Sequence, residues 1–226
     1  MKKSAPFYQT ILPEHVQKID QKGRQILEEI GVSITGETFL NKLEAEGAHV
    51  DFDNHRVRFG GDCLDKLLSR APSRFTLYSR DGKNDLHVGE GNVYFGNGGR
   101  VFRILDLGTG GYRYTMLRDV ANTAILVDHL DYIRFYIVAC QAHDLDAEHY
   151  HLNDFYRSFY HTTKHVMGGC TDLAGATQMW ELASLIADGE DKLKEKPFVS
   201  VITNIISPLT IDTNTLEILE FCTSRG

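Results

Sequence analysis

The segments IRFYIVAC (133–140), KHVMGGC (164–170) and PFVSVITN (197–204) decide the fold class of this sequence. Each is a short, nearly uninterrupted apolar run, which is typical of a strand buried on both faces of a sheet. A segment with helical spacing of its apolar residues follows each run, at 147–161, 172–189 and 212–226. This alternation of strands and helices predicts a parallel sheet, either in a barrel or in a doubly wound sheet.

The first 115 residues follow a different pattern. Apolar spacing predicts a helix from Pro13 that ends at Gly31, a second helix over 38–46 and a short third helix over 64–69. Between and after them lie short alternating segments, separated by turn residues such as Asp53-Asn54 and the glycines at 108–111. We therefore expect a helical start followed by a small antiparallel β layer.

The predicted fold class is α/β, with an incomplete TIM-type (β/α) barrel preceded by a helical and antiparallel β N-terminal subdomain. The predicted domains are residues 1–115 and 116–226. No G-x-G-x-x-G motif follows the first buried strand, which weakens a dinucleotide-binding interpretation. Three strand–helix units are too few to close an eight-stranded barrel of about 250 residues, so we expect the sequence to be part of a longer chain.

Composition narrows the function classes. The formal net charge of −7 disfavours a general nucleic-acid binder, which needs a basic face against phosphates. No apolar run is long enough to cross a membrane, and the N-terminal segment has no apolar core of a secretory signal, so a cytoplasmic location is expected. The four cysteines lie far apart without a C-x-x-C pair, which predicts reduced thiols and no structural zinc site.

Polar residues follow each predicted parallel strand, at the end where β/α barrels place their chemistry. A glycine-rich stretch, FGNGGR (95–100), would also let the backbone approach a ligand closely, although a plain hairpin turn explains it equally well. Short polar residues also end strands and cap helices, which is the structural alternative for each one. The candidate substrate-binding residues are Asn97, Gly98, Gln141, His143, Cys170, Asn204 and Ser207, with Thr171 beside them.

Histidines and aromatic residues crowd the middle of the chain. The histidines do not show the spacing of a metal site, because His149 and His151 point to different faces of a helix and a strand start separates His161 from His165. We therefore expect no metal ligands. Aromatic rings can enclose a quaternary ammonium by cation–π attraction, but core packing explains such rings equally well.

Longer stretches resemble a known family. VYFGNGGRVFRILDLGTGGYRYTMLRDVANTAILVDHLDYI (93–133), FYHTTKHVMGGC (159–170) and PFVSVITNIISPLTIDTNTLEILEFC (197–222) resemble the N-terminal part of the trimethylamine methyltransferase family. The resemblance covers most of the chain. It implies a TIM-barrel fold in a protein longer than 226 residues. The family includes homologues without pyrrolysine that act on glycine betaine or similar quaternary amines.

The resemblance also implies a reaction. A methyl group would move from a tertiary or quaternary methylamine to the Co(I) corrinoid of a separate partner protein, so no cofactor would be bound directly. The enzyme would hold the cationic nitrogen and align its N–CH₃ bond with the acceptor. The expected partners are the corrinoid protein and a small methylated amine. No nucleic-acid or membrane partner is expected, and association between copies of the chain is left open.

Two alternatives stay open at this point. The same barrel would suit a metal-dependent hydrolase or lyase that uses the histidines. A truncated, inactive piece of a barrel would expose apolar strand edges and tend to pair with other chains.

Overall fold

The computed structural model describes residues 10–146 and 148–225. These residues form two compact units. The first contains the residues up to Ser73 together with Asn204–Leu219, and the second contains Arg74–Thr203 together with the residues from Glu220. The helix start predicted at Ala147 and the helix end predicted at Gly226 lie outside the described residues, as does the segment before Thr10.

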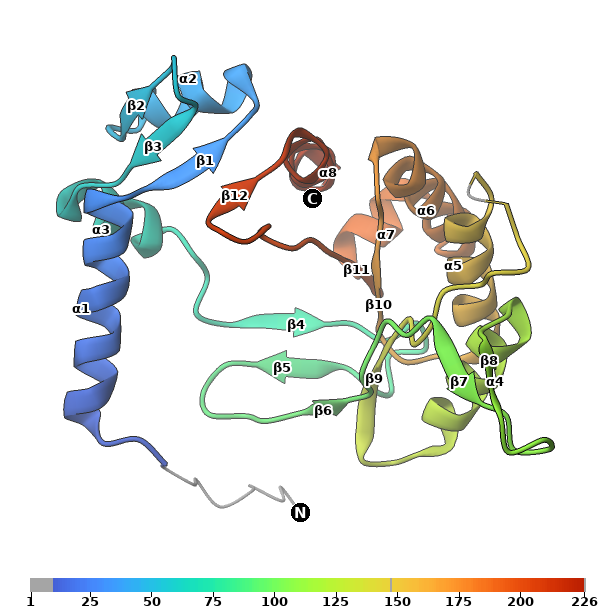
Figure 1. Ribbon diagram of the computed structural model, residues 1–226. Coiled ribbons are helices and arrows are strands. Elements are labelled where there is room, and N and C mark those ends of the chain that lie inside the picture. The colour runs from blue at the N-terminus through green and yellow to red at the C-terminus, as the bar shows by residue number, and fades with distance from the viewer. Residues whose placement is uncertain (1–9, 147, 226) are drawn as a thin grey trace. The chain divides into compact units, whose positions relative to one another are not determined.

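The first unit is built around a sheet of four short strands in the order β12-β1-β3-β2 (Figure 1). β2 and β3 form an antiparallel hairpin, β1 runs antiparallel to β3, and β12 runs parallel to β1. The elements of this unit are α1 (Pro13–Glu29), β1 (Val32–Ile34), α2 (Glu37–Ala45), β2 (His49–Asp51), β3 (Arg56–Arg58), α3 (Gly61–Ser69), β12 (Thr210–Ile211) and the first part of α8 (Thr213–Arg225).

Local chemistry explains where these elements begin and end. Gly31 ends α1 with φ of +75°, and its N–H donates to the carbonyl oxygen of Ile26 at 2.9 Å, as predicted for a C-terminal glycine. In the β2–β3 turn, the carboxylate of Asp51 accepts the backbone N–H of Asn54 at 3.0 Å. The helices and the hairpin predicted for this region are therefore confirmed.

The second unit contains a parallel sheet in the order β11-β10-β9-β6 and two antiparallel hairpins, β4–β5 and β7–β8 (Figure 1). Its strands are β4 (Phe75–Leu77), β5 (Leu86–Val88), β6 (Phe95–Gly96), β7 (Arg103–Leu105), β8 (Tyr112–Tyr114), β9 (Ile133–Ile137), β10 (Val166–Gly169) and β11 (Val199–Ile202). Its helices are α4 (Leu117–His129), α5 (Tyr150–His161), α6 (Leu173–Ile186), α7 (Glu190–Glu195) and the C-terminal part of α8.

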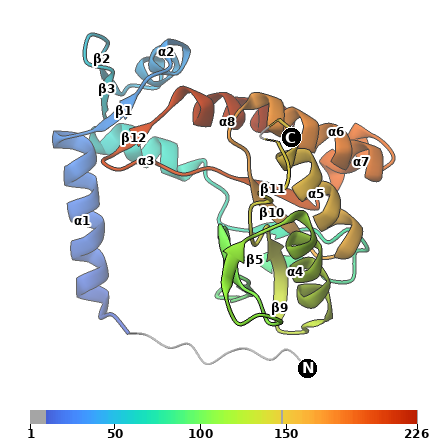
Figure 2. The same ribbon diagram turned by 45° about the vertical axis from the view of Figure 1, so that its right-hand side comes forward.

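The helices that connect the parallel strands lie on one side of the sheet (Figure 2). α4 contacts both β9 and α5, while α5 contacts β10 and α6. Side chains of alternate strand residues, such as Tyr136, Val138 and Val166, are buried in a common core with Phe155 and Trp180 of these helices. Burial of this apolar layer is what holds the α/β part of the fold together.

The stretch TTKH (162–165) fixes the start of β10 to its neighbours. Lys164 is 4% exposed, and its ammonium donates to the carbonyl oxygens of Val127, Leu130 and Ile133 at 2.6, 2.8 and 2.8 Å. These carbonyls belong to the end of α4 and the start of β9, where unpaired acceptors would otherwise be buried. Burial lowers the pKa of Lys164, although the carbonyls satisfy all three of its donors.

The structure corrects one part of the sequence interpretation. Phe95–Gly96 was predicted to belong to the antiparallel layer, but β6 pairs in parallel with β9. A Cβ atom at Gly96 would lie 2.3 Å from the ring of Phe135, so glycine permits this close approach. The FGNGG stretch is therefore not a hairpin turn, whereas the predicted turn at 108–111 does join β7 to β8. Alternation alone could not reveal the direction of pairing.

The predicted mixed α/β class with a parallel sheet is confirmed, and within 10–146 and 148–225 no closed barrel forms. The sequence did not predict α7, β1 or the pairing of β1 with β12. Strands of two or three residues have no detectable alternation, so tertiary pairing determines them.

Candidate functional site

Within the second unit, the carboxyl ends of β6, β9 and β10 lie at the same edge of the parallel sheet. The segments that follow these strands carry most of the candidate residues: Asn97 and Gly98 after β6, Gln141 and His143 after β9, and Cys170 after β10. This edge is therefore the candidate site.

Asn97 has a structural role in this edge. Its side-chain amide donates to the carbonyl oxygen of Ile137 at 2.7 Å, and its amide oxygen accepts the N–H of Ile137 at 2.8 Å. The side chain thereby continues the hydrogen-bond pattern of β6 for one more residue along β9. Gly98 is exposed and has open space around its Cα, so nothing in the described fold requires a glycine there.

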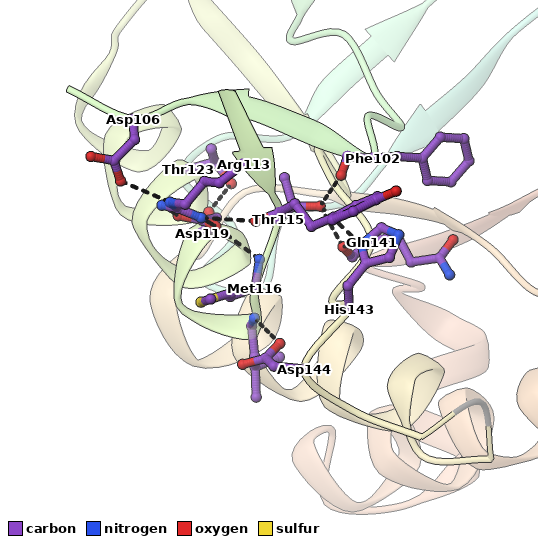
Figure 3. A network of polar contacts seen from close by, with 12 residues as sticks. Phe102, Asp106, Arg113, Thr115, Met116, Asp119, Thr123, Gln141, His143 and Asp144 are labelled. Carbon is purple, nitrogen blue, oxygen red and sulfur yellow. Dashed lines mark hydrogen bonds and ion pairs between the residues drawn. The ribbon is translucent and has the colours of Figure 1, made fainter. Parts of the chain in front are cut away.

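Thr115 links three segments beneath the site (Figure 3). The side chain is fully buried, and its hydroxyl donates to the carbonyl oxygen of Gln141 at 2.6 Å. Its backbone N–H donates to the carbonyl oxygen of Phe102 at 3.1 Å, and its own carbonyl accepts the N–H of His143 at 2.9 Å. The turn after β9 is therefore fixed to both ends of the β7–β8 hairpin.

The imidazole of His143 is exposed but held in one orientation. Its Nδ1 lies 3.0 Å from the carbonyl oxygen of Gln141 and 3.4 Å from the hydroxyl of Thr115. Because a carbonyl can only accept, Nδ1 carries the proton in the neutral ring, and Nε2 of that form has a free lone pair. The ring packs against Tyr114 at 4.9 Å and edge-on against Phe102 at 6.0 Å between centroids. In the neutral ring, His143 Nε2 is therefore a hydrogen-bond acceptor held beside the aromatic rings of Tyr114 and Phe102.

A set of charged contacts anchors the hairpin against α4 (Figure 3). Arg113 binds both carboxylate oxygens of Asp119 at 2.7 and 2.9 Å and one oxygen of Asp106 at 2.8 Å. These contacts raise the pKa of Arg113 and hold the pKa of Asp106 at about 2. Asp119 also accepts the N–H of Met116 at 2.8 Å, and Asp144 accepts that of Leu117 at 2.8 Å. Both carboxylates therefore cap the start of α4.

A second polar group lies between the sheet and α5. Arg100 donates to the carboxylate of Asp154 at 3.3 Å, and its guanidinium lies 4.9 Å from the centroid of the Tyr150 ring. Burial raises the pKa of Asp154 to about 7, although the charge of Arg100 opposes this rise. His151 accepts the N–H of Thr171 at 3.2 Å, and burial lowers its pKa to about 4. These buried groups fix the end of β10 to α5.

The surroundings of Cys170 disfavour the thiolate form that a nucleophile requires. Burial raises the pKa of its thiol to about 12, so the reactive thiolate is scarce at neutral pH. The same applies to Cys140 in the segment after β9, because burial raises the pKa of its thiol to about 12 as well. Cys170 contributes a packing surface beside the core of the second unit.

Asn204 and Ser207 belong to the first compact unit, where the segment after β11 leads to β12. Their role in substrate binding stays a prediction. Among the described residues, no group of three or more His, Cys, Asp or Glu is arranged to hold a metal ion. The ring of His151 is instead hydrogen-bonded to Thr171, and the ring of His165 to Tyr78 and Ser200.

A hollow of about 470 Å³ lies between the β7–β8 hairpin and α4. Its charged lining residues include Arg113, Asp106 and Asp119, which already satisfy one another. We therefore favour the edge at Gln141 and His143, where the described contacts leave the Gln141 side-chain amide and His143 Nε2 available.

The sequence did not identify Thr115, Arg100 or Asp154. Thr115 looks like an ordinary residue before a helix, and the contact between Arg100 and Asp154 spans 54 positions. A local signal was present in the charges around the hairpin. Asp106 follows β7, Arg113 lies in β8, and Asp119 lies in the first turn of α4, so opposite charges are close together in the sequence.

Comparison with protein families matches residues 1–226 to trimethylamine methyltransferase (MTTB). The chain belongs to the trimethylamine methyltransferase (MTTB) family. It is 30% identical over 206 residues to trimethylamine methyltransferase MttB of Desulfitobacterium hafniense strain DSM 10664 / DCB-2, covering 91% of this chain and 42% of that protein. It is also 30% identical over 217 residues to the glycine betaine methyltransferase of Desulfitobacterium hafniense strain Y51, covering 95% of this chain and 44% of that protein.

A more distant relative is trimethylamine methyltransferase MttB of Methanosarcina thermophila, 23% identical over 214 residues. The chain spans less than half the length of each of these relatives. In the described part of the chain, none of the helices combines the length and the apolar character needed to cross a membrane.

Proposed function

We propose that this chain is part of an enzyme that moves a methyl group from a tertiary or quaternary methylamine to the Co(I) corrinoid of a separate protein. The observation that carries the proposal is the family match over all 226 residues, with relatives named for trimethylamine and for glycine betaine. The edge at Gln141 and His143 supports it, because it offers acceptors and aromatic rings of the kind that bind an ammonium group.

We also propose that the parallel sheet is part of a TIM-type barrel. The strands β6, β9, β10 and β11 are neighbours in chain order, and their connecting helices lie on one face. A doubly wound sheet would carry helices on both faces, so this arrangement favours a barrel. The domain boundary between residues 115 and 116 stays a prediction.

The residues of the site would bind and orient rather than react. When the methyl group is transferred, the nitrogen must leave as a neutral amine. A quaternary ammonium meets this condition, and so does a tertiary amine that is protonated when it reacts and keeps that proton. His143 Nε2 would accept a hydrogen bond from the N–H of a protonated tertiary amine without removing that proton, and the direction of the N–H would then fix the three methyl groups. The free amide of Gln141 would present its oxygen to the positively polarised methyl groups. When bound, the corrinoid supplies the nucleophile that accepts the methyl group.

The metal-dependent hydrolase or lyase is not favoured, because the family and the relatives reported above are named as methyltransferases. The proposal is tested with the protein as its gene encodes it, under anaerobic conditions, with chemically reduced cobalamin as the methyl acceptor. Trimethylamine and glycine betaine are supplied separately, and the demethylated product is measured by proton NMR. Absence of demethylation across a panel of methylated amines, with a folded protein, would reject it.

A further inference from the structure

The β7–β8 hairpin presents different side chains on its two faces. Arg103 lies directly opposite Tyr114 in the register of the two strands, and Arg113 precedes Tyr114 along β8. Because side chains alternate along a strand, Arg103 and Tyr114 share one face and Arg113 lies on the other. Arg113 anchors its face to α4 through Asp119. The face with Arg103 and Tyr114 adjoins the candidate site, because the ring of Tyr114 packs against His143.

The guanidinium of Arg103 is held in place without a carboxylate partner. It lies 4.8 Å from the centroid of the Tyr114 ring and donates to the Tyr114 hydroxyl oxygen at 3.2 Å. Within residues 10–146 and 148–225, no carboxylate forms an ion pair with Arg103, whereas Arg113 of the same hairpin binds two of them. A guanidinium has five N–H donors, and a carboxylate is the planar anion that fits them. Arg103 therefore keeps donors for an anionic ligand.

The hydroxyl of Tyr114 also has a proton to donate. A guanidinium can only donate, so the phenol oxygen is the acceptor in the contact with Arg103 and its own proton is not used there. The hydrogen bonds among the described residues provide no acceptor for that proton, and Tyr114 is 54% exposed, so a ligand can reach it. The hydrogen bond from Arg103 lowers the pKa of Tyr114, which makes the hydroxyl a better donor.

These donors lie beside the place where the ammonium group is proposed to bind. The rings of Tyr114 and His143 are 4.9 Å apart between centroids. Figure 3 shows Gln141 and His143 on one side of Thr115 and Arg113 on the other. A substrate held by its ammonium group at Gln141 and His143 would therefore have the Tyr114 hydroxyl next to it. In glycine betaine a single methylene group separates the nitrogen from the carboxylate, so one site must bind both charges close together.

We propose that Arg103 and the hydroxyl of Tyr114 form a carboxylate-binding subsite, so that the enzyme binds a quaternary amine that bears a carboxylate more tightly than one that does not. The inference rests on the proposed function, because that function places the ammonium group at His143. The carboxylate would accept an N–H of Arg103 and the O–H of Tyr114, and its charge would compensate that of the guanidinium. Trimethylamine and choline have no carboxylate for these donors.

Affinity is measured by isothermal titration calorimetry on the protein as its gene encodes it, without a methyl acceptor, so that binding is separated from reaction. Glycine betaine and choline are the probes, because both carry a trimethylammonium group and choline has an alcohol in place of the carboxylate. We expect glycine betaine to bind at least about tenfold more tightly than choline. Arg103→Gln should reduce this ratio by about tenfold or more. Arg103→Lys, which keeps the charge, and Tyr114→Phe, which keeps the ring, should each reduce it less.

Arg118→Gln is the matched control, because it removes the same charge from an exposed arginine that lines the hollow between the hairpin and α4. It should leave the ratio unchanged, and circular dichroism checks that each variant is folded. Equal affinities for the two probes in the unaltered protein would overturn the subsite. A preference for glycine betaine that Arg103→Gln leaves intact would overturn it as well.

The methyl-transfer assay is read separately from the titrations. Demethylation of amines by a protein that shows no preference for glycine betaine over choline would reject the subsite and keep the proposed function. A preference that is lost in Arg103→Gln, in a protein that demethylates no amine, would support the subsite and reject the proposed reaction. In an active enzyme, Arg103→Gln should raise the KM for glycine betaine more than it lowers kcat, because the carboxylate is distant from the bond that breaks.

Discussion

The hydroxyl of Thr115 donates to the carbonyl oxygen of Gln141 at 2.6 Å, although the two residues lie 26 positions apart. Thr115 precedes α4, and Gln141 follows β9. Since the backbone of His143 is hydrogen-bonded to Thr115 as well, this one residue determines how the turn after β9 presents its side chains.

Replacing Thr115 by valine removes a buried hydroxyl while keeping the shape of the side chain. We expect the free energy of unfolding to fall by about 1–3 kcal/mol, because a lone pair of the Gln141 carbonyl loses its partner. Chemical denaturation measures the change. Thr115→Ser keeps the hydroxyl and should cost less. A valine variant as stable as the original protein would show that this hydrogen bond is unimportant.

Changing His143 should affect tertiary and quaternary amines differently. His143→Phe keeps an aromatic ring but removes the Nε2 acceptor, so reaction with trimethylamine should fall by about 10- to 100-fold more than reaction with glycine betaine. Steady-state rates with both amines measure this difference in the full-length enzyme. An equal loss for both amines would contradict a hydrogen-bonding role. In the unaltered protein, ¹⁵N NMR should show a proton on Nδ1 of His143.

The pH dependence of stability should reveal the two buried titratable residues of α5, Asp154 and His151. The pKa of Asp154 is raised to about 7, so between pH 4 and 7 the folded protein binds a proton that the unfolded chain releases, and stability falls as pH rises. The pKa of His151 is lowered to about 4, so the unfolded chain binds the extra proton between pH 4 and 6.5, and stability rises. The two slopes oppose each other.

Asp154→Asn removes the falling slope and leaves the rising one. Relative to the original protein, the free energy of unfolding should then increase with pH by up to about 1.4 kcal/mol per pH unit more between pH 4 and 6.5. Thermal unfolding across this range measures the slopes, and His151→Gln should shift the dependence in the opposite direction. Identical pH profiles for Asp154→Asn and the original protein would contradict the raised pKa of Asp154.

Glycines that look alike in sequence should respond differently to alanine. Gly96→Ala places a Cβ atom 2.3 Å from the Phe135 ring, and we expect a loss of about 1–3 kcal/mol in stability. Gly98→Ala meets nothing within 4 Å and should leave stability nearly unchanged. Denaturation of both variants checks this. The Gly98 variant also tests substrate binding at that position, because any loss of affinity would not come from unfolding.

The sequence predicted the helices and the parallel strands well, because long periodic segments such as α6 and buried runs such as β9 carry their own signal. It placed Phe95 in the wrong sheet, since a two-residue strand shows no direction of pairing. It singled out His143 by position but not Thr115, which acts through contacts distant in sequence. Substrate binding by Asn97 stays a prediction, and the hydrogen bonds of its side chain to Ile137 are contacts that no local pattern encodes.

The ammonium of Lys164 has a consequence for how this chain can vary. It holds one carbonyl of α4, one of the connection and one of β9 within 2.6–2.8 Å. Side chains in the connection between His129 and Ile133 can change without disturbing these backbone oxygens, but an insertion or deletion there would move at least one of them away. Homologues that retain a lysine at this position should therefore keep the length of this connection constant while its residues differ.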